Sequence, residues 1–491
     1  MLRLGKTVDG NEPVELSLDE RRQGTYIIGT TGTGKSTLLK NIIYQDLRDD
    51  AEHGICVLDP HGDLIDELLE LVPKNRIKDV ILFDPTDLER PFGLNLLACD
   101  RNDPHQVRWV VSTIMGTLRR LYSYSWGPRL EHVLRHSLLT AMLLPDSTFI
   151  ELTLLLSNEN YRKRIVEQVK DPIIKEFWNS FPRSERERYD LISSTLNKIS
   201  PFITDQSMRN IIGQPQNTVD LRKVMDEGKI LFVNLSKGDL GEESSALLGS
   251  VIVNLVLISS LQRRSIPVHN RRPFHLIVDE FQNMATESFA ILQSEARKYA
   301  VDVVVAHQYR DQLLDDLSRG STLNVGNMVV FRATGRDSYE LASQFDNTPP
   351  PPEKTMEPIY RKYDNASDGE TLYIQPKSTT GVGNLYHEVE RIRRTYSDME
   401  GERANKLSIS PNFEAWCRLI HVPKKGRPQL VERHILTENL GDQDREPKIS
   451  EQIRENSRNL AKTKKEVEKD IAKRSFGEIE ESGAIATAET I

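Results

Sequence analysis

The stretch that decides the fold reads Thr25-Tyr26-Ile27-Ile28-Gly29-Thr30-Thr31-Gly32-Thr33-Gly34-Lys35-Ser36-Thr37. A short apolar run leads into a glycine-rich turn, and apolar residues then recur at helical spacing from Leu38 to Ile43. The spacing Gly29-x4-Gly34-Lys35-Ser36 satisfies the P-loop pattern, which requires a strand before the loop and a helix after it. The sequence therefore predicts a phosphate-binding loop at this strand-to-helix junction.

Each residue type in this loop suits phosphate chemistry. Glycines allow successive backbone N–H groups to point at phosphate oxygens, and the dipole of the following helix faces the same anion. Lys35 is expected to contact the β- and γ-phosphates, and Ser36 is expected to complete a Mg2+ shell. The predicted cofactors are ATP and Mg2+. The predicted nucleotide contacts are Gly29, Thr30, Thr31, Gly32, Thr33, Gly34, Lys35, Ser36 and Thr37.

A P-loop needs a carboxylate at the end of a neighbouring strand. The run 275–278 is mostly apolar and is followed by Asp279 and Glu280. We predict that Asp279 holds Mg2+ through water and that Glu280 polarises the attacking water, because two adjacent acids favour hydrolysis over transfer to a small substrate. Asp59 also ends an apolar run and is a rival for Asp279, although Pro60 follows it and no second acid does.

One further strand end carries polar side chains. The apolar run 303–306 is followed by His307 and Gln308. Ligands of parallel sheets lie at the carboxyl ends of the strands. We therefore predict that Gln308 senses the γ-phosphate, whereas His307 satisfies local hydrogen bonds.

The rest of the chain predicts how this site is built into a fold. Apolar runs without alternation are typical of strands covered on both faces of a parallel sheet. They occur at 25–28, 54–59, 80–84, 230–235, 274–279, 301–306 and 328–331. Between about 103 and 224 the apolar residues recur only at helical spacing, which predicts an all-helical insert in an α/β fold. We expect an ATPase core at 1–102 and 225–348, with the helical lobe at 103–224 between its two parts. A polar C-terminal segment follows at 349–437, with short strands near 416–420 and 429–431. The charged tail at 438–491 is expected to be a solvated helix or disordered.

Composition restricts the partners and the compartment. The 491 residues carry a net charge of -8, so any contact with nucleic acid must come from local Lys and Arg clusters. Three widely spaced cysteines suggest no disulfide framework, and a reducing cytoplasm fits best. The stretch 244–262 is free of charge and approaches the length of a membrane span, but its Gly, Ser and Asn residues favour a buried helix. No transmembrane segment is predicted.

Several segments, in this order, resemble the HerA–FtsK superfamily of ring-forming ATPases. They are Ile28–Thr37, Leu58–Leu64 (Leu-Asp-Pro-His-Gly-Asp-Leu), Phe92–Leu97, Ile230–Gly238, Asp279–Phe281, and Ala296–Tyr299 through Gln308. The resemblance covers roughly residues 3–345 and is strongest to type IV secretion coupling proteins of the TraG/TraD kind and to HerA-like DNA translocases. Only the P-loop is specific by itself.

The resemblance implies a RecA-like core, a homo-hexamer with nucleotide at the subunit borders, and an arginine from the neighbouring subunit that stabilises the γ-phosphate charge. Arg297 and Arg332 are the two candidates for that arginine. The chain departs from several branches of the superfamily, since it begins almost at its first core strand. It therefore resembles a soluble, shortened member.

Two functions of different class fit these residues. The first is an ATP-hydrolysing ring motor that binds and translocates DNA, in conjugative transfer or in DNA processing and defence. DNA contacts without sequence specificity would come from basic clusters at 119–120, 162–164, 271–272 and 424–425. The alternative is an assembly or switch ATPase that recruits a nuclease or effector. The implied accessory partners are a relaxosome, a secretion channel or a nuclease.

Overall fold

The computed structural model describes residues 1–49, 53–313, 316–351, 353–358, 361–364, 371–374, 386–391, 394–423 and 426–476. The chain forms two compact units. The first comprises Met1–Arg332 together with Pro411–Ile491, and the second comprises Ala333–Ser410.

The first unit is built on an eleven-stranded sheet in the order β2-β1-β15-β14-β9-β3-β8-β7-β4-β6-β5. The strands from β9 to β5 are parallel neighbours, and they are the seven apolar runs of the sequence. Their bounds are β3 Thr25–Ile28, β4 Gly54–Asp59, β5 Val80–Phe83, β6 Ile230–Asn234, β7 Phe274–Val278, β8 Val301–His307 and β9 Asn327–Val330. Nearly every residue in them is buried, as expected for strands covered on both faces. The prediction of an α/β fold with a mostly parallel sheet is confirmed.

Four antiparallel strands extend this sheet beyond β9. They are β1 Leu2–Thr7, β2 Pro13–Leu16, β14 Glu414–His421 and β15 Gln429–Leu436. β14 pairs with β9, and β15 pairs with both β14 and β1. The N-terminal hairpin and the C-terminal hairpin therefore belong to one sheet with the parallel core. The sequence predicted short strands near 416–420 and 429–431 but not their place in the main sheet.

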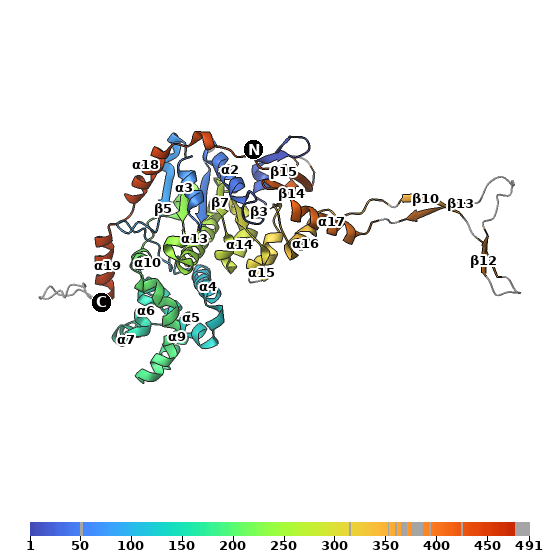
Figure 1. The fold of residues 1–491 in the computed structure, drawn as a ribbon. Helices are drawn as coiled ribbons and strands as arrows, with labels where there is room; N and C mark the ends of the chain where they lie inside the picture. The colour runs from blue at the N-terminus through green and yellow to red at the C-terminus, as the bar shows by residue number, and fades with distance from the viewer. Residues whose placement is uncertain are drawn as a thin grey trace. The chain divides into compact units, whose positions relative to one another are not determined.

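Helices cover both faces of the parallel strands (Figure 1). The crossovers β3-α2-β4 and β4-α3-β5 run along the sheet in one direction, and β6-α13-β7 and β7-α14-β8 run in the other. Right-handed crossovers therefore place the two groups on opposite faces. Their bounds are α2 Lys35–Leu47, α3 Asp63–Leu69, α13 Glu242–Gln262 and α14 Glu287–Glu295. Short helices in the connections are α1 Leu18–Arg21, α12 Lys237–Leu240 and α15 Asp316–Leu323.

Helix α13 is the uncharged stretch that resembles a membrane span. Every residue from Ser245 to Ser260 is buried. Within the described part of the chain, the segment Glu242–Ser265 alone is long and apolar enough to cross a membrane, and 89% of its apolar window is buried inside the protein. The prediction of a buried helix is confirmed.

The stretch predicted as the inserted lobe consists of helices and the connections between them. The helices are α4 Pro104–Leu121, α5 Pro128–Met142, α6 Phe149–Ser157, α7 Glu159–Val166, α8 Pro172–Asn179, α9 Glu185–Thr204, α10 Gln206–Ile212 and α11 Leu221–Glu227. α4 packs along α13, whereas α5 to α9 gather below the sheet (Figure 1). α4 is therefore the helix that joins the core to the lobe.

Two charged helices near the C-terminus, α18 Pro447–Arg458 and α19 Lys464–Phe476, belong to the first unit. In α18, Ile449 and Ile453 are buried in the same core as α2 and α3. In α19, Val467 and Ile471 pack with Ile150 of α6. The segment is helical, as one of the two alternatives had it, and most of its residues are exposed, but apolar residues four positions apart give each helix one buried face.

The second unit contains α16 Arg336–Ala342, α17 Tyr396–Ile409 and two antiparallel strand pairs. α16 and α17 pack on each other, and Leu341, Ala404 and Leu407 are buried there. β10 Glu353–Pro358 pairs with β13 Tyr386–Arg391, and β11 Arg361–Asp364 pairs with β12 Thr371–Ile374.

Candidate functional site

The predicted phosphate loop lies between β3 and α2, as its spacing required. Gly34 precedes the first residue of α2 and has a φ of 116°, and Gly32 has a φ of 76°. Only glycine adopts such angles without strain. The Lys35 Nζ donates to the carbonyl oxygens of Gly29 at 2.7 Å and Thr30 at 3.2 Å. The Lys35 ammonium therefore lies against its own loop. It would reach a bound phosphate by exchanging these two carbonyl oxygens for phosphate oxygens.

Close packing behind the loop explains its first glycine. A Cβ on Gly29 would lie 2.5 Å from the Cβ of Phe331, the residue after β9. Thr30 N also donates to the carbonyl of Arg332 at 2.8 Å. The loop therefore rests on the end of β9, and no side chain fits between them.

The carboxylates and the predicted sensor meet this loop because β3, β8 and β7 are adjacent in the sheet. Gln308, after β8, donates from Nε2 to Glu280 Oε1 at 2.9 Å. The Thr31 hydroxyl donates to Gln308 Oε1 at 3.0 Å. Asp279 Oδ1 accepts from the N–H of Glu280 at 2.9 Å. One glutamine side chain thus bridges the phosphate loop and the candidate base.

Glu280 has an unusual backbone. Its φ is 44°, in the left-handed region that residues with a side chain seldom adopt. Its side chain is buried, and Oε2 accepts from Gln282 Nε2 at 2.6 Å. Strain of this kind is concentrated at functional sites, where the surroundings hold it in place.

The site has more buried negative charge than positive charge. Burial, and then the charges of Glu280 and Asp59, raise the pKa of Asp279 to about 6. Burial lowers the pKa of Lys35 against the attraction of Glu280 and Asp279. One buried lysine does not balance the carboxylates, so the site favours binding of a cation.

A cavity of about 300 Å3 adjoins these residues. It is lined by Ser36, Thr37, Lys40, Asp59, His61, Asp63, Leu64, Glu67 and Asp279. Hydroxyl and carboxylate oxygens are the ligands that Mg2+ prefers. The donor set and the raised pKa of Asp279 therefore fit a Mg2+ ion held by Ser36 and Asp279, the pair that the sequence predicted.

The rival carboxylate Asp59 lines the same cavity, but its oxygens have backbone partners. Oδ1 accepts from His61 N at 2.9 Å, and Oδ2 accepts from the N–H groups of Leu64 and Ile65 at 3.0 and 3.2 Å. Asp59 therefore caps the N-terminus of α3.

His307 has the structural role expected of it. Its Nε2 lies 2.6 Å from the hydroxyl of Tyr26, within a buried contact. Burial, and then the charges of Arg310 and Lys35, lower the pKa of His307 to about 3. The ring is therefore neutral at physiological pH.

The two candidate arginines lie at opposite ends of the strands. Arg297 is exposed in a turn just before β8, at the edge away from Gln308, and donates to Gln23 Oε1 at 2.5 Å. Arg332 follows β9 beside the phosphate loop and donates to Asn412 Oδ1 at 2.5 Å. Arg297 is therefore too far along the sheet to serve the phosphate loop of its own chain.

Phe413 is a neighbour of the loop that the sequence did not reveal. Its N–H donates to the carbonyl of Thr33 at 2.7 Å, and its Cα would lie 3.1 Å from a Cβ on Gly34. Its own φ is 68°, again in the left-handed region. No local pattern in the sequence marks it, because the contact depends on β14 pairing with β9.

The predicted basic clusters are largely occupied by backbone contacts. Arg120 donates to carbonyl oxygens of the loop after Glu280, and Arg162 donates to those of Leu155 and Leu156. Arg271 and Arg272 likewise donate to carbonyls, those of Ile266 and Glu227. Their neighbours at 119, 163 and 164 are exposed. The pair 424–425 lies outside the described residues.

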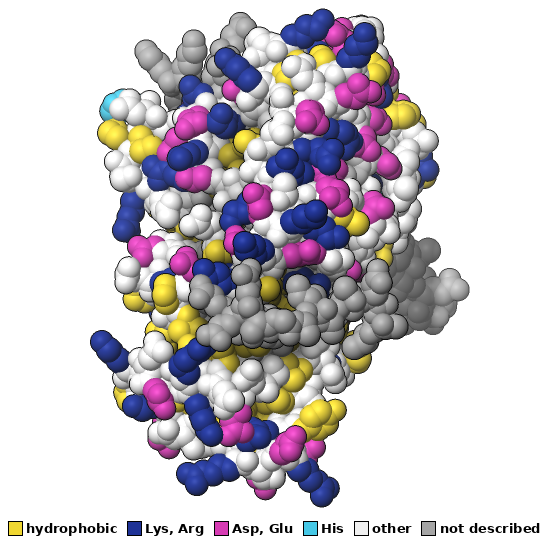
Figure 2. All heavy atoms as spheres, turned by 90° about the vertical axis from the view of Figure 1, so that its left-hand side faces the viewer, with side chains coloured by type: hydrophobic (Ala, Val, Ile, Leu, Met, Phe, Trp, Pro, Cys, Tyr) yellow, Lys and Arg dark blue, Asp and Glu magenta, His cyan; other side chains and the backbone are white. Residues whose placement is uncertain are grey.

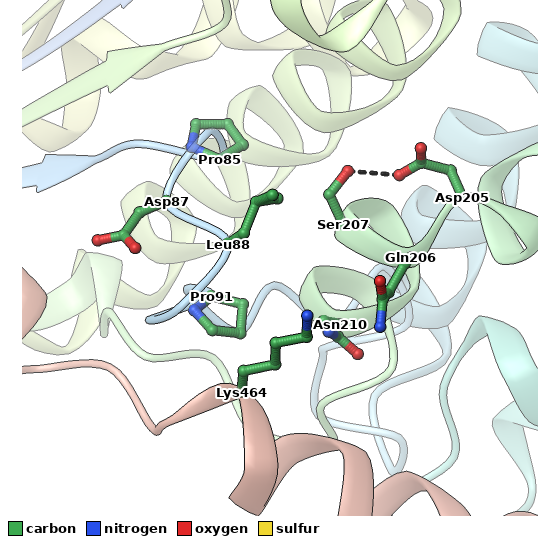
Figure 3. A pocket seen from close by; sticks show the side chains of 9 residues that line it. All are labelled: Pro85, Asp87, Leu88, Pro91, Asp205, Gln206, Ser207, Asn210 and Lys464. Carbon is green, nitrogen blue, oxygen red and sulfur yellow. Dashed lines mark hydrogen bonds between the residues drawn. The ribbon is translucent and has the colours of Figure 1, made fainter. Parts of the chain in front are cut away.

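A second cavity, of about 180 Å3, shares no lining residue with the cavity at the phosphate site, and Figure 3 shows the side chains that line it. It is lined by Pro85, Asp87, Leu88, Pro91, Asp205, Gln206, Ser207, Asn210 and Lys464. These residues come from the loop after β5, from α10 with the residue before it, and from the start of α19. The cavity marks the joint at which core, lobe and C-terminal helices meet.

Comparison with known proteins places this geometry in a family. The family model described as "Helicase HerA, central domain" matches residues 2–256, just over half of the 491 residues. A search for relatives among curated proteins gives no significant match.

Solved structures of the plasmid coupling protein TrwB share the fold. An unbound form is 18% identical, with 89% of each chain covered and a TM-score of 0.55. A complex with the GTP analogue GDPNP is 17% identical, covers 89% of this chain and 91% of TrwB, and has a TM-score of 0.55. A complex with ADP and Mg2+ is 16% identical, covers 90% and 91%, and has a TM-score of 0.54. The predicted membership of the HerA–FtsK superfamily is confirmed: the chain belongs to the family of the HerA helicase central domain.

Proposed function

We propose that this chain is a Mg2+-dependent ATPase that works as a ring motor and binds and translocates DNA. The observation that carries the proposal is the hydrogen-bonded chain from Thr31 through Gln308 to Glu280. It joins the P-loop to the buried carboxylate of Glu280, to which we assign the role of polarising the attacking water. Nucleotide-bound structures of TrwB, which share the fold, give further support.

Each residue has a distinct part in the proposed hydrolysis. Lys35 exchanges the carbonyls of Gly29 and Thr30 for phosphate oxygens when nucleotide binds. Glu280 accepts a hydrogen bond from the attacking water and orients it toward the γ-phosphorus. Ser36 and Asp279 would hold Mg2+, which would supply positive charge to the phosphate oxygens. Gln308 senses the γ-phosphate and couples the position of Glu280 to that of the phosphate loop through its two hydrogen bonds.

The ring and the arginine finger remain proposals drawn from the superfamily. An arginine of a neighbouring subunit would add positive charge to a site that has too little. Arg297 is exposed at the sheet edge opposite the phosphate site of its own chain, so it could serve only the nucleotide of a neighbouring subunit. Arg332 is the other candidate. Micrographs of Glu280→Gln protein with ATP and DNA test the assembly, since a six-fold ring is the expected image.

Charge on the surface bears on where DNA binds. On the face that carries α18, Lys and Arg are interspersed with Asp and Glu (Figure 2). Arg454 pairs there with Asp66 and Asp84, and Arg458 pairs with Asp87. This face therefore does not favour a polyanion. The exposed residues Arg119 and Arg164 are the better candidates for phosphate contacts, whereas the exposed Lys163 pairs with Glu159 at 2.7 Å.

The test is the rate of ATP hydrolysis by purified protein with single-stranded DNA, with double-stranded DNA and without DNA. We expect DNA to raise the rate, and added salt to weaken the effect steeply. Lys35→Ala protein sets the background and is expected to be inactive but folded. Hydrolysis that no DNA stimulates would reject the motor and leave the alternative, an assembly or switch ATPase that recruits a partner.

A further inference from the structure

The candidate base Glu280 is held by a loop, and that loop is held by the helical lobe. Residues 281–283 form a short 3-10 turn directly after Glu280. Gln282 in this turn donates to Glu280 Oε2 at 2.6 Å, and Asn283 Nδ2 donates to the Glu280 carbonyl at 2.9 Å. The position of the carboxylate therefore depends on the position of the turn.

Arg120, in the last turn of α4, fixes this turn from outside. Its Nη1 donates to the carbonyls of Gln282 at 2.9 Å and Ala285 at 3.1 Å. Its Nη2 donates to the carbonyl of Asn283. One rigid guanidinium thus gathers three carbonyl oxygens, which an ammonium on a flexible stem does far less well.

The same end of α4 is attached to the core at other points. The hydroxyl of Tyr122, two residues after Arg120, donates to Glu243 at the start of α13 at 2.6 Å. Further back on α4, Thr113 bonds to Ser288 of α14 at 2.8 Å. α4 then continues into α5 and the rest of the lobe. A movement of the lobe that shifts the end of α4 therefore reaches the turn after Glu280.

We infer that Arg120 is a positioning residue for the proposed hydrolysis, which couples the helical lobe to Glu280 through the turn at residues 281–285. The inference rests on the proposed ATPase function. Arg120 does not touch the nucleotide. It sets the orientation of Glu280 by holding the carbonyls of Gln282, Asn283 and Ala285. It is therefore unavailable for the DNA contact that the sequence predicted for the cluster 119–120.

The first measurement is steady-state hydrolysis by Arg120→Ala protein together with its affinity for ATP. We expect kcat to fall by about tenfold, which is typical for the loss of a supporting hydrogen-bond partner. The KM and the affinity for ATP should stay near those of the wild type, because the phosphate loop is untouched. Arg120→Lys should recover only part of kcat. Arg108→Ala is the matched control, since Arg108 is an exposed arginine of the same helix α4, and its basal kcat should be unchanged.

A double-mutant cycle separates positioning from a general loss of packing. Gln282→Ala should show the same fall in kcat without a fall in affinity, and it removes no core residue. If Arg120 acts through Gln282, the double variant should be little worse than either single variant. The coupling would be overturned if the fall in kcat of the double variant equalled the product of the two single falls. An Arg120→Ala protein with wild-type kcat would overturn it as well.

The outcomes are distinct from those that reject the proposed function. Lys35→Ala protein that still hydrolyses ATP rejects the phosphate site itself, whatever Arg120 does. Loss of activity in Lys35→Ala together with full activity in both Arg120→Ala and Gln282→Ala rejects only the coupling. Should Arg120→Ala fail to fold, Gln282→Ala and Arg120→Lys still decide the question, because both keep the polar anchoring of α4.

Discussion

Strands β7 and β8 carry buried charge at both ends, and the two ends are organised in opposite ways. Where the strands begin, His275 Nδ1 lies 2.6 Å from Asp302 Oδ1. Arg21 there binds Asp46 through two hydrogen bonds of 2.6 and 2.8 Å. Arg21 also lies 3.6 Å from Asp302 Oδ2. Where the strands end, Asp279 and Glu280 face one buried lysine.

The pKa values express the difference. Burial alone would raise the pKa of Asp302, but His275 and Arg21 outweigh it and hold that pKa below its ordinary value. Burial would likewise lower the pKa of Arg21, but Asp46 and Asp302 raise it. At the other end the pKa of Asp279 is raised. The first end supplies its own counter-charges and is structural, whereas the second is completed by what binds to it.

The largest expected effect is at the unbalanced end. Glu280→Gln removes the acceptor that orients water, so we expect turnover to fall by about 10^3-fold while ATP binding is retained. Phosphate release and equilibrium nucleotide binding measure the two properties. Glu287→Gln is the control, because Glu287 is exposed in the first turn of α14. Undiminished turnover in Glu280→Gln would place the base elsewhere.

The balanced end should respond in stability rather than in activity. Asp302→Asn leaves the buried His275 without its carboxylate and removes one of the two acids beside Arg21, which should lower the free energy of unfolding by about 3 kcal/mol. Turnover per folded molecule should be unchanged. Denaturant unfolding of this variant, beside Asp190→Asn at an exposed position of α9, gives the measurement.

The pH dependence of that effect has a definite sign. Since the pKa of Asp302 is lowered in the folded protein, its stabilisation is present above the ordinary aspartate pKa of 3.8 and is lost as the pH falls through the lowered value. The stability gap between Asp302→Asn and wild type should therefore narrow in acid. A gap that widens in acid contradicts the pairing described here.

The smallest expected effect concerns Gln308, which belongs to the unbalanced end but carries no charge. Gln308→Ala breaks the bridge between Thr31 and Glu280, and we expect kcat to fall by about tenfold. ATP affinity should change little. Gln262→Ala, at an exposed position of α13, is the control. An effect as large as that of Glu280→Gln would give Gln308 a direct part in the chemistry.

How far the sequence predicts this molecule depends on how local each signal is. The parallel strands follow from continuous apolar runs such as residues 54–59. The meeting of Lys35, Asp279 and Gln308 follows from the rule that ligands gather at the carboxyl ends of such strands. No comparable rule predicts that Arg120 binds the turn after Glu280. Arg120 looks like part of a basic surface until α4 is placed beside α13.

The C-terminal part was harder to predict for a related reason. β14 alternates buried and less buried residues, which marks a strand but not its partner. In α18 the charged residues outnumber Ile449 and Ile453, so the buried face is narrow and easily overlooked. Contacts such as that of Phe413 with Thr33 join residues 380 positions apart, and only the completed sheet brings them together.

The position of β14 beside β9 has a consequence for synthesis of the chain. On a ribosome, the P-loop and its carboxylates emerge long before the strand that covers the edge of β9. Until then that edge offers unpaired backbone groups to any other strand, including those of a neighbouring nascent chain. Fragments released before about residue 411 would therefore be prone to aggregate, and they would lack the backing that Phe413 gives to the phosphate loop. The phosphate loop is therefore complete only when the segment that contains Phe413, late in the chain, has been translated.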